Sequence, residues 1–249
     1  MIDNIVTTSI IIWVTLAITR IVASIIKNNG IMDSIRGIGF LIIATFWYGV
    51  NTDPSVWQNI LYILIIIRSI SLTSYITRRN NWKPEDFRYQ KRREEWGSLA
   101  IRRSLVQIYL LQWVMMLIIS LPIIYGMNND IQIRQVIIWT IIFSIGYYRE
   151  AKWNRELIIF KKDKINKGKL LTTGLRNKSR HPNYFGEACI WRGIRICTLP
   201  ALRTIASPIL ITYLLRYVSW VPLLEKKYEW RKDFEQYKKQ TPVFFPKIK

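Results

Sequence analysis

The stretch LVQIYLLQWVMMLIISLPIIY, from Leu105 to Tyr125, contains no charged residue. A helix that crosses a membrane needs about 20 mostly apolar residues to span roughly 30 Å of hydrocarbon. A soluble core does not require an uncharged run of this length. This stretch is therefore predicted to be a transmembrane helix, and it decides the fold class of the chain.

The rest of the chain repeats this pattern of long apolar blocks separated by charged segments, and half of its 249 residues are hydrophobic. The other blocks are Ile5 to Ile26, Ile38 to Val50, Val56 to Ile76, Ile131 to Tyr148 and Ala188 to Leu224. The last block is long enough for two crossings, with Pro200 and Arg203 at the bend. The pattern predicts an all-α fold, a polytopic bundle of about seven transmembrane helices.

The basic residues lie between and after these blocks. Residues 77–103, 149–180 and 226–249 are strongly basic, whereas residues 51–55 and 126–130 contain no lysine or arginine. Loops rich in lysine and arginine stay on the cytoplasmic side because they resist translocation. With seven spans, every basic segment falls on one side, so we expect the N-terminus outside and the C-terminus in the cytoplasm.

These features predict a single integral membrane domain over residues 1–249. Residues 1–76 would form three N-terminal spans, residues 77–104 a basic cytoplasmic loop, and residues 105–249 four spans and a cytoplasmic tail. We expect a multi-pass protein of the endoplasmic reticulum or an equivalent membrane if the source is eukaryotic or viral. In a bacterium the corresponding membrane is the inner membrane.

Composition argues against two other classes of partner. A net charge of +21 with 13% aromatic residues would suggest nucleic-acid binding in a soluble chain. Here the positive-inside topology explains the charge, so we expect membrane lipids and no nucleic acid as partners. His181 is the only histidine, and Cys189 and Cys197 do not form a cluster with it, so no metal site is expected.

The most distinctive polar stretch is GLRNKSRHPNYFGE, from Gly174 to Glu187. Pro182 suits the first position of a helix, because the N–H that proline lacks would be unpaired there anyway. The start of such a helix directs backbone N–H groups and a positive dipole end toward the basic segment before it, which favours phosphate binding. The alternative is an ordinary helix start at the membrane surface, with Arg180 and His181 at the level of the lipid head groups.

Together with Trp191 and Gly193, the sequence SRHPNYFGE resembles the signature of the steroid 5-alpha-reductase-like family of NADPH-dependent reductases, in particular its branch of uncharacterised membrane proteins, DUF1295. The resemblance covers most of the chain from about Asp33 onward. Further matching segments are Glu85 to Tyr89, Gly146 to Lys161, and the tail from Leu223 to Pro246.

The resemblance implies an NADPH site at the cytoplasmic ends of the C-terminal helices. The positions that match the family's cofactor-binding residues are Arg180, His181, Asn183, Tyr184, Glu187 and Tyr237, with Asn154 and Lys161 as second choices. The implied reaction is hydride transfer from NADPH to a carbon–carbon double bond of a lipophilic substrate, such as a sterol-like or enone lipid. Tyr184 and Glu187 are the candidate catalytic residues, since they lie on the helix that should carry the cofactor.

Spacing adds two observations. Glu150, Asn154 and Lys161 fall four and seven residues apart, so one helix would place them on a common stripe, which could equally be a solvated face. Arg192 and Arg195 lie deeper, in a block that must be at least half buried in lipid. They would either neutralise cofactor phosphates or extend to the membrane surface, and we expect the second.

Two alternatives remain open. Membrane methyltransferases that use S-adenosylmethionine, such as the isoprenylcysteine carboxyl methyltransferases, have a related Arg-His-Pro-x-Tyr motif. Some family positions also differ here: the substitutions are Asn154, Glu156, Arg176, Lys178 and Phe234. They motivate the second alternative, a non-catalytic lipid-binding membrane protein with the same fold.

Overall fold

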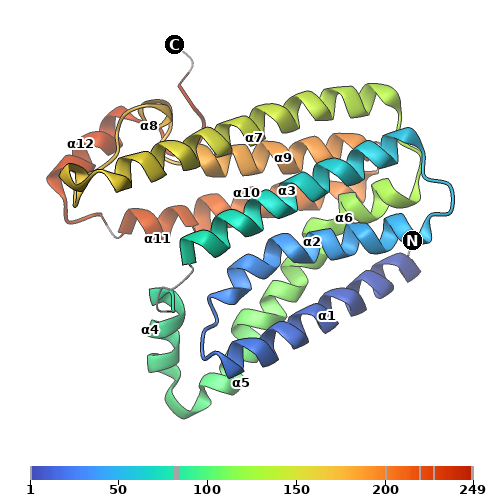
Figure 1. Cartoon of the computed structure of the whole chain (residues 1–249), viewed down its shortest axis with the longest axis horizontal. Coiled ribbons are helices and arrows are strands. Elements are labelled where there is room, and N and C mark those ends of the chain that lie inside the picture. The colour runs from blue at the N-terminus through green and yellow to red at the C-terminus, as the bar shows by residue number, and fades with distance from the viewer. Residues whose placement is uncertain (1, 81–84, 200, 219, 227, 248–249) are drawn as a thin grey trace. The chain divides into compact units, whose positions relative to one another are not determined.

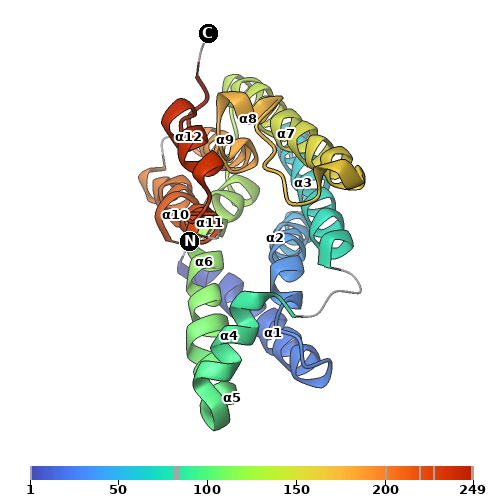
Figure 2. The ribbon, with the colours of Figure 1, turned by 90° about the vertical axis from the view of Figure 1, so that its left-hand side faces the viewer.

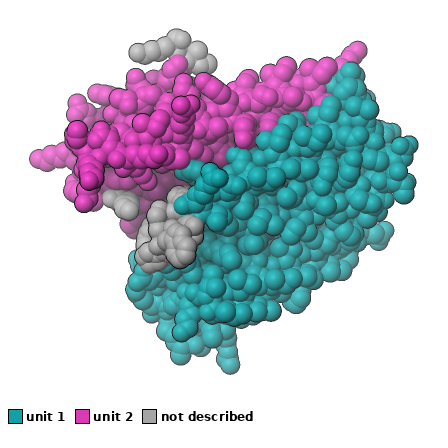
Figure 3. All heavy atoms as spheres, in the orientation of Figure 1, with its two compact units in different colours: residues 1–133 teal, residues 134–249 magenta. Residues whose placement is uncertain are grey.

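The structure is a computed structural model that describes residues 2–80, 85–199, 201–218, 220–226 and 228–247. Every regular element in these ranges is a helix and none is a strand, which confirms the predicted all-α fold (Figure 1). The chain divides into two compact units, residues 1–133 and 134–249 (Figure 3).

Four long helices build the first unit (Figure 1). They are α1 (Ile2–Ile25), α2 (Ile31–Val50), α3 (Val56–Asn80) and α6 (Leu111–Asn128). The shorter helices α4 (Phe87–Trp96), η1 (Gly97–Leu99) and α5 (Ala100–Ser104) lead into the π-helix η2 (Leu105–Leu110), which continues into α6. Helix α2 packs against α3, and both α1 and α2 pack against α6.

The interior of this unit is apolar, but many of its outward side chains are apolar as well. Ile43, Leu61 and Met116 are fully buried, whereas Ile10 and Trp13 are more than half exposed. Gly39 admits the Met116 side chain between α2 and α6, because a Cβ atom at position 39 would collide with it. Apolar residues on both the inside and the outside, with small residues at helix contacts, are typical of a protein whose solvent is lipid.

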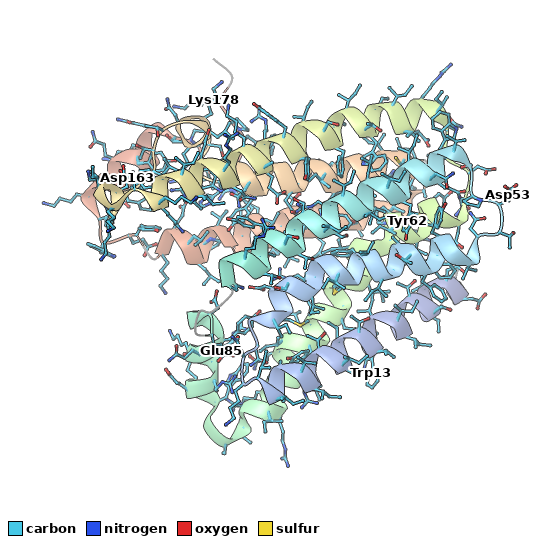
Figure 4. The ribbon with its side chains drawn as sticks, viewed as in Figure 1. Trp13, Asp53, Tyr62, Glu85, Asp163 and Lys178 are labelled. Atoms are coloured by element: carbon cyan, nitrogen blue, oxygen red, sulfur yellow. The ribbon has the colours of Figure 1, made fainter. Side chains whose placement is uncertain are left out.

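The basic segment between α3 and α6 is not the simple loop that the sequence predicted. Helix α4 forms there, and Glu85 just before it accepts hydrogen bonds from the backbone N–H of Asn29 at 2.7 Å and from Arg93 at 2.9 and 3.1 Å (Figure 4). The hydroxyl of Tyr109 donates to the Asn29 side chain at 3.0 Å. This polar network fixes the segment against the turn between α1 and α2.

The second unit is built around α7 (Ile133–Lys162) and α9 (Pro182–Cys197), which lie side by side (Figures 1 and 2). Along the chain, the short helices η3 (Lys164–Asn166) and α8 (Leu175–Lys178) come after α7 and before α9. After α9, the elements η4 (Leu202–Ile205), α10 (Ala206–Tyr213), the π-helix η5 (Leu214–Val218) and α11 (Trp220–Lys226) follow one another, and α12 (Lys232–Gln240) precedes the tail. Helix α10 packs against α9.

Glycines allow α7 and α9 to approach each other closely. A Cβ atom at Gly186 would lie 2.6 Å from the carbonyl oxygen of Gly146, and one at Gly146 would lie 2.7 Å from the carbonyl oxygen of Gly186. Nearer the end of α9, Gly193 makes room for the fully buried indole of Trp139. The face of α9 that carries these glycines is therefore the face that packs on α7.

The described residues contain five helical segments long and apolar enough to cross a membrane, so the chain is an integral membrane protein. They are Ile2–Ile25, Ile31–Val50, Val56–Arg78, Tyr89–Asn128 and Leu202–Lys226. The other two predicted spans also contain helices, α7 and α9, but neither of these is both long enough and apolar enough to be counted with the five. Helix α7 is charged in its second half, and α9, with 16 residues, is only about 24 Å long. The predicted count of seven and the orientation stay predictions.

The bend predicted in the last apolar block is present. Helix α9 ends at Cys197 and the next helical turn begins at Leu202. The Thr198 and Thr204 hydroxyls lie 2.8 Å apart and both are buried, so they join the two ends of this bend. Pro200, which marked the bend in the sequence, lies outside the described residues.

Candidate functional site

The segment before α9 is shaped by a glycine and a carboxylate. Gly174 has a φ of +63°, and a Cβ atom there would lie 2.6 Å from the Glu156 carboxylate. Glu156, on α7, accepts a hydrogen bond from the backbone N–H of Leu175 at 3.0 Å. Glycine is needed at position 174 because this positive φ disfavours other residues and because a side chain would collide with the Glu156 carboxylate. The chain then turns through α8, and α9 begins at Pro182 as the sequence predicted.

The C-terminal tail pairs with the residues just before α9. The backbone N–H of Arg180 donates to the Pro242 carbonyl at 2.9 Å, and that of His181 donates to the Val243 carbonyl at 3.2 Å. The fully buried Ser179 hydroxyl donates to the Phe244 carbonyl at 2.9 Å. The amides of residues 180 and 181 are therefore occupied, and those that a ligand could use at this helix start begin at Asn183. The prediction that backbone N–H groups at the start of α9 face a ligand therefore concerns Asn183 and the residues after it, because Pro182 has no N–H.

A buried charge cluster lies at the start of α9. The Glu225 carboxylate, from α11, lies 3.2 Å from the Arg180 Nε and 3.0 Å from the His181 Nε2. The three side chains are at most 13% exposed. Sequence reasoning did not place Glu225 in the site. The one signal in the sequence was that Glu225 directly follows the last apolar block, in a tail that resembles the C-terminal segment of the family.

Burial sets the protonation of His181. Burial lowers the pKa of His181 below its usual 6.5, and although the hydrogen bond to Glu225 opposes this, the net shift is downward. The imidazole is therefore neutral at neutral pH, and its Nε2–H donates to Glu225. Burial also lowers the pKa of Arg180, with Glu225 opposing the shift, but a guanidinium remains charged in proteins.

The depressed pKa of His181 predicts a pH dependence of stability. The unfolded chain takes up a proton at His181 below pH 6.5 while the folded chain resists it, so stability is lost as the pH falls below 6.5. The loss from this one group is at most about 1.4 kcal/mol per pH unit. His181→Gln keeps a donor for Glu225 but does not titrate, so its free energy of unfolding should fall less between pH 7 and 5. Chemical denaturation in detergent measures both slopes, and equal slopes would contradict the assignment.

Arg176 joins the site through its backbone and its guanidinium. The guanidinium lies over the Trp153 ring, 4.9 Å from its centroid, and the Arg176 carbonyl accepts a hydrogen bond from the Tyr237 hydroxyl at 2.7 Å. Burial raises the pKa of Tyr237 to about 12, so this hydroxyl stays protonated. Tyr237 thus anchors the segment before α9 to α12. Arg176, one of the positions at which this sequence differs from the family pattern, is a half-buried cation.

Tyr237→Phe should destabilise the protein by about 1 to 3 kcal/mol, because the Arg176 carbonyl then loses its hydroxyl donor. Tyr213→Phe is the matched control, since Tyr213 is more than half exposed. Its free energy of unfolding should stay within about 0.5 kcal/mol of the wild type. If both variants unfold at the same denaturant concentration, the Tyr237 hydroxyl does not hold this segment.

The remaining predicted residues divide between two helices. On α9, the Tyr184 ring stacks on His181 with centroids 5.5 Å apart, and Glu187 accepts a hydrogen bond from the Trp191 indole at 2.9 Å. Asn183 is half-buried beside them. On α7, Asn154 is half-buried, and Lys161 is exposed in the last turn. The start of α9 and the two residues just before it therefore bring Arg180 to Glu187 together, whereas Asn154 and Lys161 belong to the neighbouring helix.

The stripe predicted on α7 is not a uniformly solvated face. Glu150, Asn154 and Lys161 all lie on this one helix, as expected. Glu150, however, is 8% exposed and packs against Gly186, where its Cβ would be 3.4 Å from an added Cβ atom. The stripe thus runs from the buried contact with α9 to the exposed end of α7.

Several buried polar atoms at this site make no hydrogen bond within the described residues. They are Nε and Nη1 of Arg180, Nε of Arg176 and Oδ1 of Asn154. The Arg180 Nε lies at ion-pair distance from Glu225 but without hydrogen-bond geometry. Buried polar groups are nearly always satisfied in folded proteins. An anionic ligand with additional hydroxyl groups would fit this set of donors and one acceptor.

The apolar helices and the buried cluster at the start of α9 define a helical integral membrane protein with a polar site. The chain belongs to the family described as "Protein of unknown function (DUF1295)", which matches residues 19–241. No curated protein and no solved structure matches the chain. Among the described residues, no group of three or more histidine, cysteine, aspartate or glutamate side chains could hold a metal ion.

Proposed function

We propose that this protein is a membrane-embedded reductase that uses NADPH to reduce a carbon–carbon double bond of a lipophilic substrate. The observation that carries the proposal is the Arg180 guanidinium, which is buried at the start of α9 with two nitrogens lacking hydrogen bonds. When bound, NADPH would supply the hydride. The resemblance of the sequence SRHPNYFGE to the steroid 5-alpha-reductase-like family supports the choice of cofactor.

The electrostatics of the cluster favour a phosphate. Arg176 and Arg180 both interact with the Glu225 carboxylate, while Arg216 adds a further positive charge near Arg180 and Glu235 a further negative one. Since His181 is neutral, positive charge is in excess. An uncompensated buried cation costs several kcal/mol, and a bound anion would offset this cost. Arginine is suited to phosphate because its planar fork donates two parallel hydrogen bonds. The positive end of the α9 dipole adds to the attraction.

The other residues would orient the reaction. Glu225, fixed by His181, holds Arg180 in place from one side. The Asn154 Oδ1 would accept a hydrogen bond from the cofactor or substrate. The Tyr184 hydroxyl, on the ring that stacks on His181, would donate the proton to the substrate, and Glu187 would position Trp191 in the next turn of α9. The apolar helices would exclude water from the hydride step.

Cofactor binding by the full chain in mild detergent tests the proposal. The wild type should bind NADPH. Arg180→Gln combined with Asn183→Ala should weaken the affinity for NADPH by about 10-fold to 100-fold, because charged hydrogen bonds of about 1.5 to 3 kcal/mol are lost. Arg155→Gln is the matched control, since Arg155 is exposed on α7. Its affinity should equal that of the wild type.

Three outcomes would contradict the reductase. The first is an unchanged NADPH affinity in the double variant while its thermal unfolding shows that it is folded. The second is saturable binding of S-adenosylmethionine in place of NADPH, which would favour the methyltransferase alternative. The third is that neither nucleotide binds, which would support the non-catalytic alternative.

A further inference from the structure

One arginine lies deep in α9, away from the cluster at its start. Arg195 is 8% exposed, and its Nε and Nη1 are buried without a hydrogen-bond partner in the part of the chain that the structure describes. The expectation that Arg195 extends to the membrane surface is therefore wrong. Its side chain is enclosed by the protein, where a charge without a counterion is costly.

The position of Arg195 on α9 shows what it could meet. At 100° per residue, Arg195 shares a helix face with Trp191 and Tyr184, and Glu187 flanks this face. The opposite face is the one whose glycines pack on α7. Arg195 lies eight residues beyond Glu187, which is about 12 Å along the helix, and about 20 Å from the start of α9 at Pro182. A phosphate held by Arg180 would therefore be far from Arg195.

We infer that Arg195 binds an acidic group of the substrate, so that the substrate is an anionic amphiphile with its acid about 12 Å along α9 from its reacting part. This inference rests on the proposed function, because Tyr184 and Glu187 mark the reacting end. A carboxylate or phosphate on an apolar chain would satisfy the buried guanidinium by two parallel hydrogen bonds. The apolar part would lie along the face that carries Trp191, which is 4% exposed.

Binding of oleate by the full chain in a nonionic detergent tests the inference, with oleyl alcohol as the uncharged probe. The wild type should bind oleate at least 10-fold more tightly than oleyl alcohol. Arg195→Leu should remove this preference, because the guanidinium is lost while an apolar side chain fills its place. Arg203→Leu, which removes an exposed arginine just after the bend that follows α9, is the control and should keep the preference.

Further arms separate the sources of the anion. Oleate should bind equally well with and without saturating NADPH, because the carboxylate held by Arg195 lies about 12 Å along α9 from the residues where substrate and cofactor meet. Competition between them, or weaker NADPH binding by Arg195→Leu, would assign Arg195 to the cofactor and overturn the inference. A preference of the wild type over Arg195→Leu for oleate that is present in phosphatidylcholine nanodiscs but lost in phosphatidylglycerol nanodiscs would assign the site to a bilayer lipid and also overturn it. Failure of the proposed function would appear separately, in the NADPH titration of the Arg180 variant.

A measurement on the wild type covers the case in which Arg195→Leu does not fold. The carboxyl carbon of ¹³C-labelled oleate reports its ionisation by NMR, and a carboxylate held by arginine should titrate at a lower pH than the same group in detergent micelles. A bound carboxyl group that titrates at or above the micelle value would overturn the inference. So would equal affinity of the wild type for oleate and oleyl alcohol, or no binding of oleate.

Discussion

Gly186→Leu is expected to prevent the native packing of α7 on α9. Even the first atom of the new side chain would lie 2.6 Å from the Gly146 carbonyl oxygen, and backbone cannot move aside as a flexible side chain can. Overpacking usually costs about 1 to 3 kcal/mol, and we expect this variant to reach or exceed the upper value. The better helix propensity of leucine, worth under about 1 kcal/mol, does not offset the collision.

Gly49→Ala is the matched control for this prediction. Gly49 lies in α2, and an added Cβ atom there would meet no atom within 4 Å. Alanine should therefore stabilise the helix by about 0.5 to 1 kcal/mol or leave it unchanged. The yield of monodisperse protein and the thermal unfolding temperature in detergent measure both variants. Near-wild-type stability of Gly186→Leu would show that α7 and α9 do not touch at this pair.

Glu225→Gln should cost about 3 to 5 kcal/mol, because it breaks a buried ion pair and leaves the Arg180 guanidinium without a counterion. The side chains of the pair are 7% and 13% exposed, so water replaces little of the lost interaction. Denaturant unfolding measures the loss. Glu235→Gln is the control, since Glu235 pairs with Lys238 at the surface and should contribute less than about 1 kcal/mol.

A double variant distinguishes the charge effect from a packing effect. Arg180→Met together with Glu225→Gln removes both charges of the pair, so part of the stability lost in Glu225→Gln should return. The same double variant should not bind NADPH under the proposed function. If the stability losses of Arg180→Met and Glu225→Gln, measured singly, add up to the loss of the double variant, then Arg180 and Glu225 are not coupled.

The elements that depend on local sequence were predicted well. The uncharged run Leu105 to Tyr125 is helical throughout, as η2 followed by α6, because hydrocarbon requires every backbone hydrogen bond to be made within the segment. The start of α9 at Pro182 and the bend after Cys197 were also predicted, because proline chemistry and the length of an apolar block are local properties. In contrast, helix α4 was missed, since its charged sequence has no apolar stripe.

The sequence by itself determined that this chain is a helical membrane protein, and it identified the residues from Arg180 to Glu187 as the polar motif. Only the tertiary structure placed Glu225 against Arg180 and His181, paired the tail at Pro242 to Phe244 with the start of α9, and buried Arg195. The reason is physical: hydrophobic length and helix starts are set by neighbouring residues. The partner of a buried charge is set by how segments 40 or more residues apart pack together, and no local pattern in the chain specifies that packing.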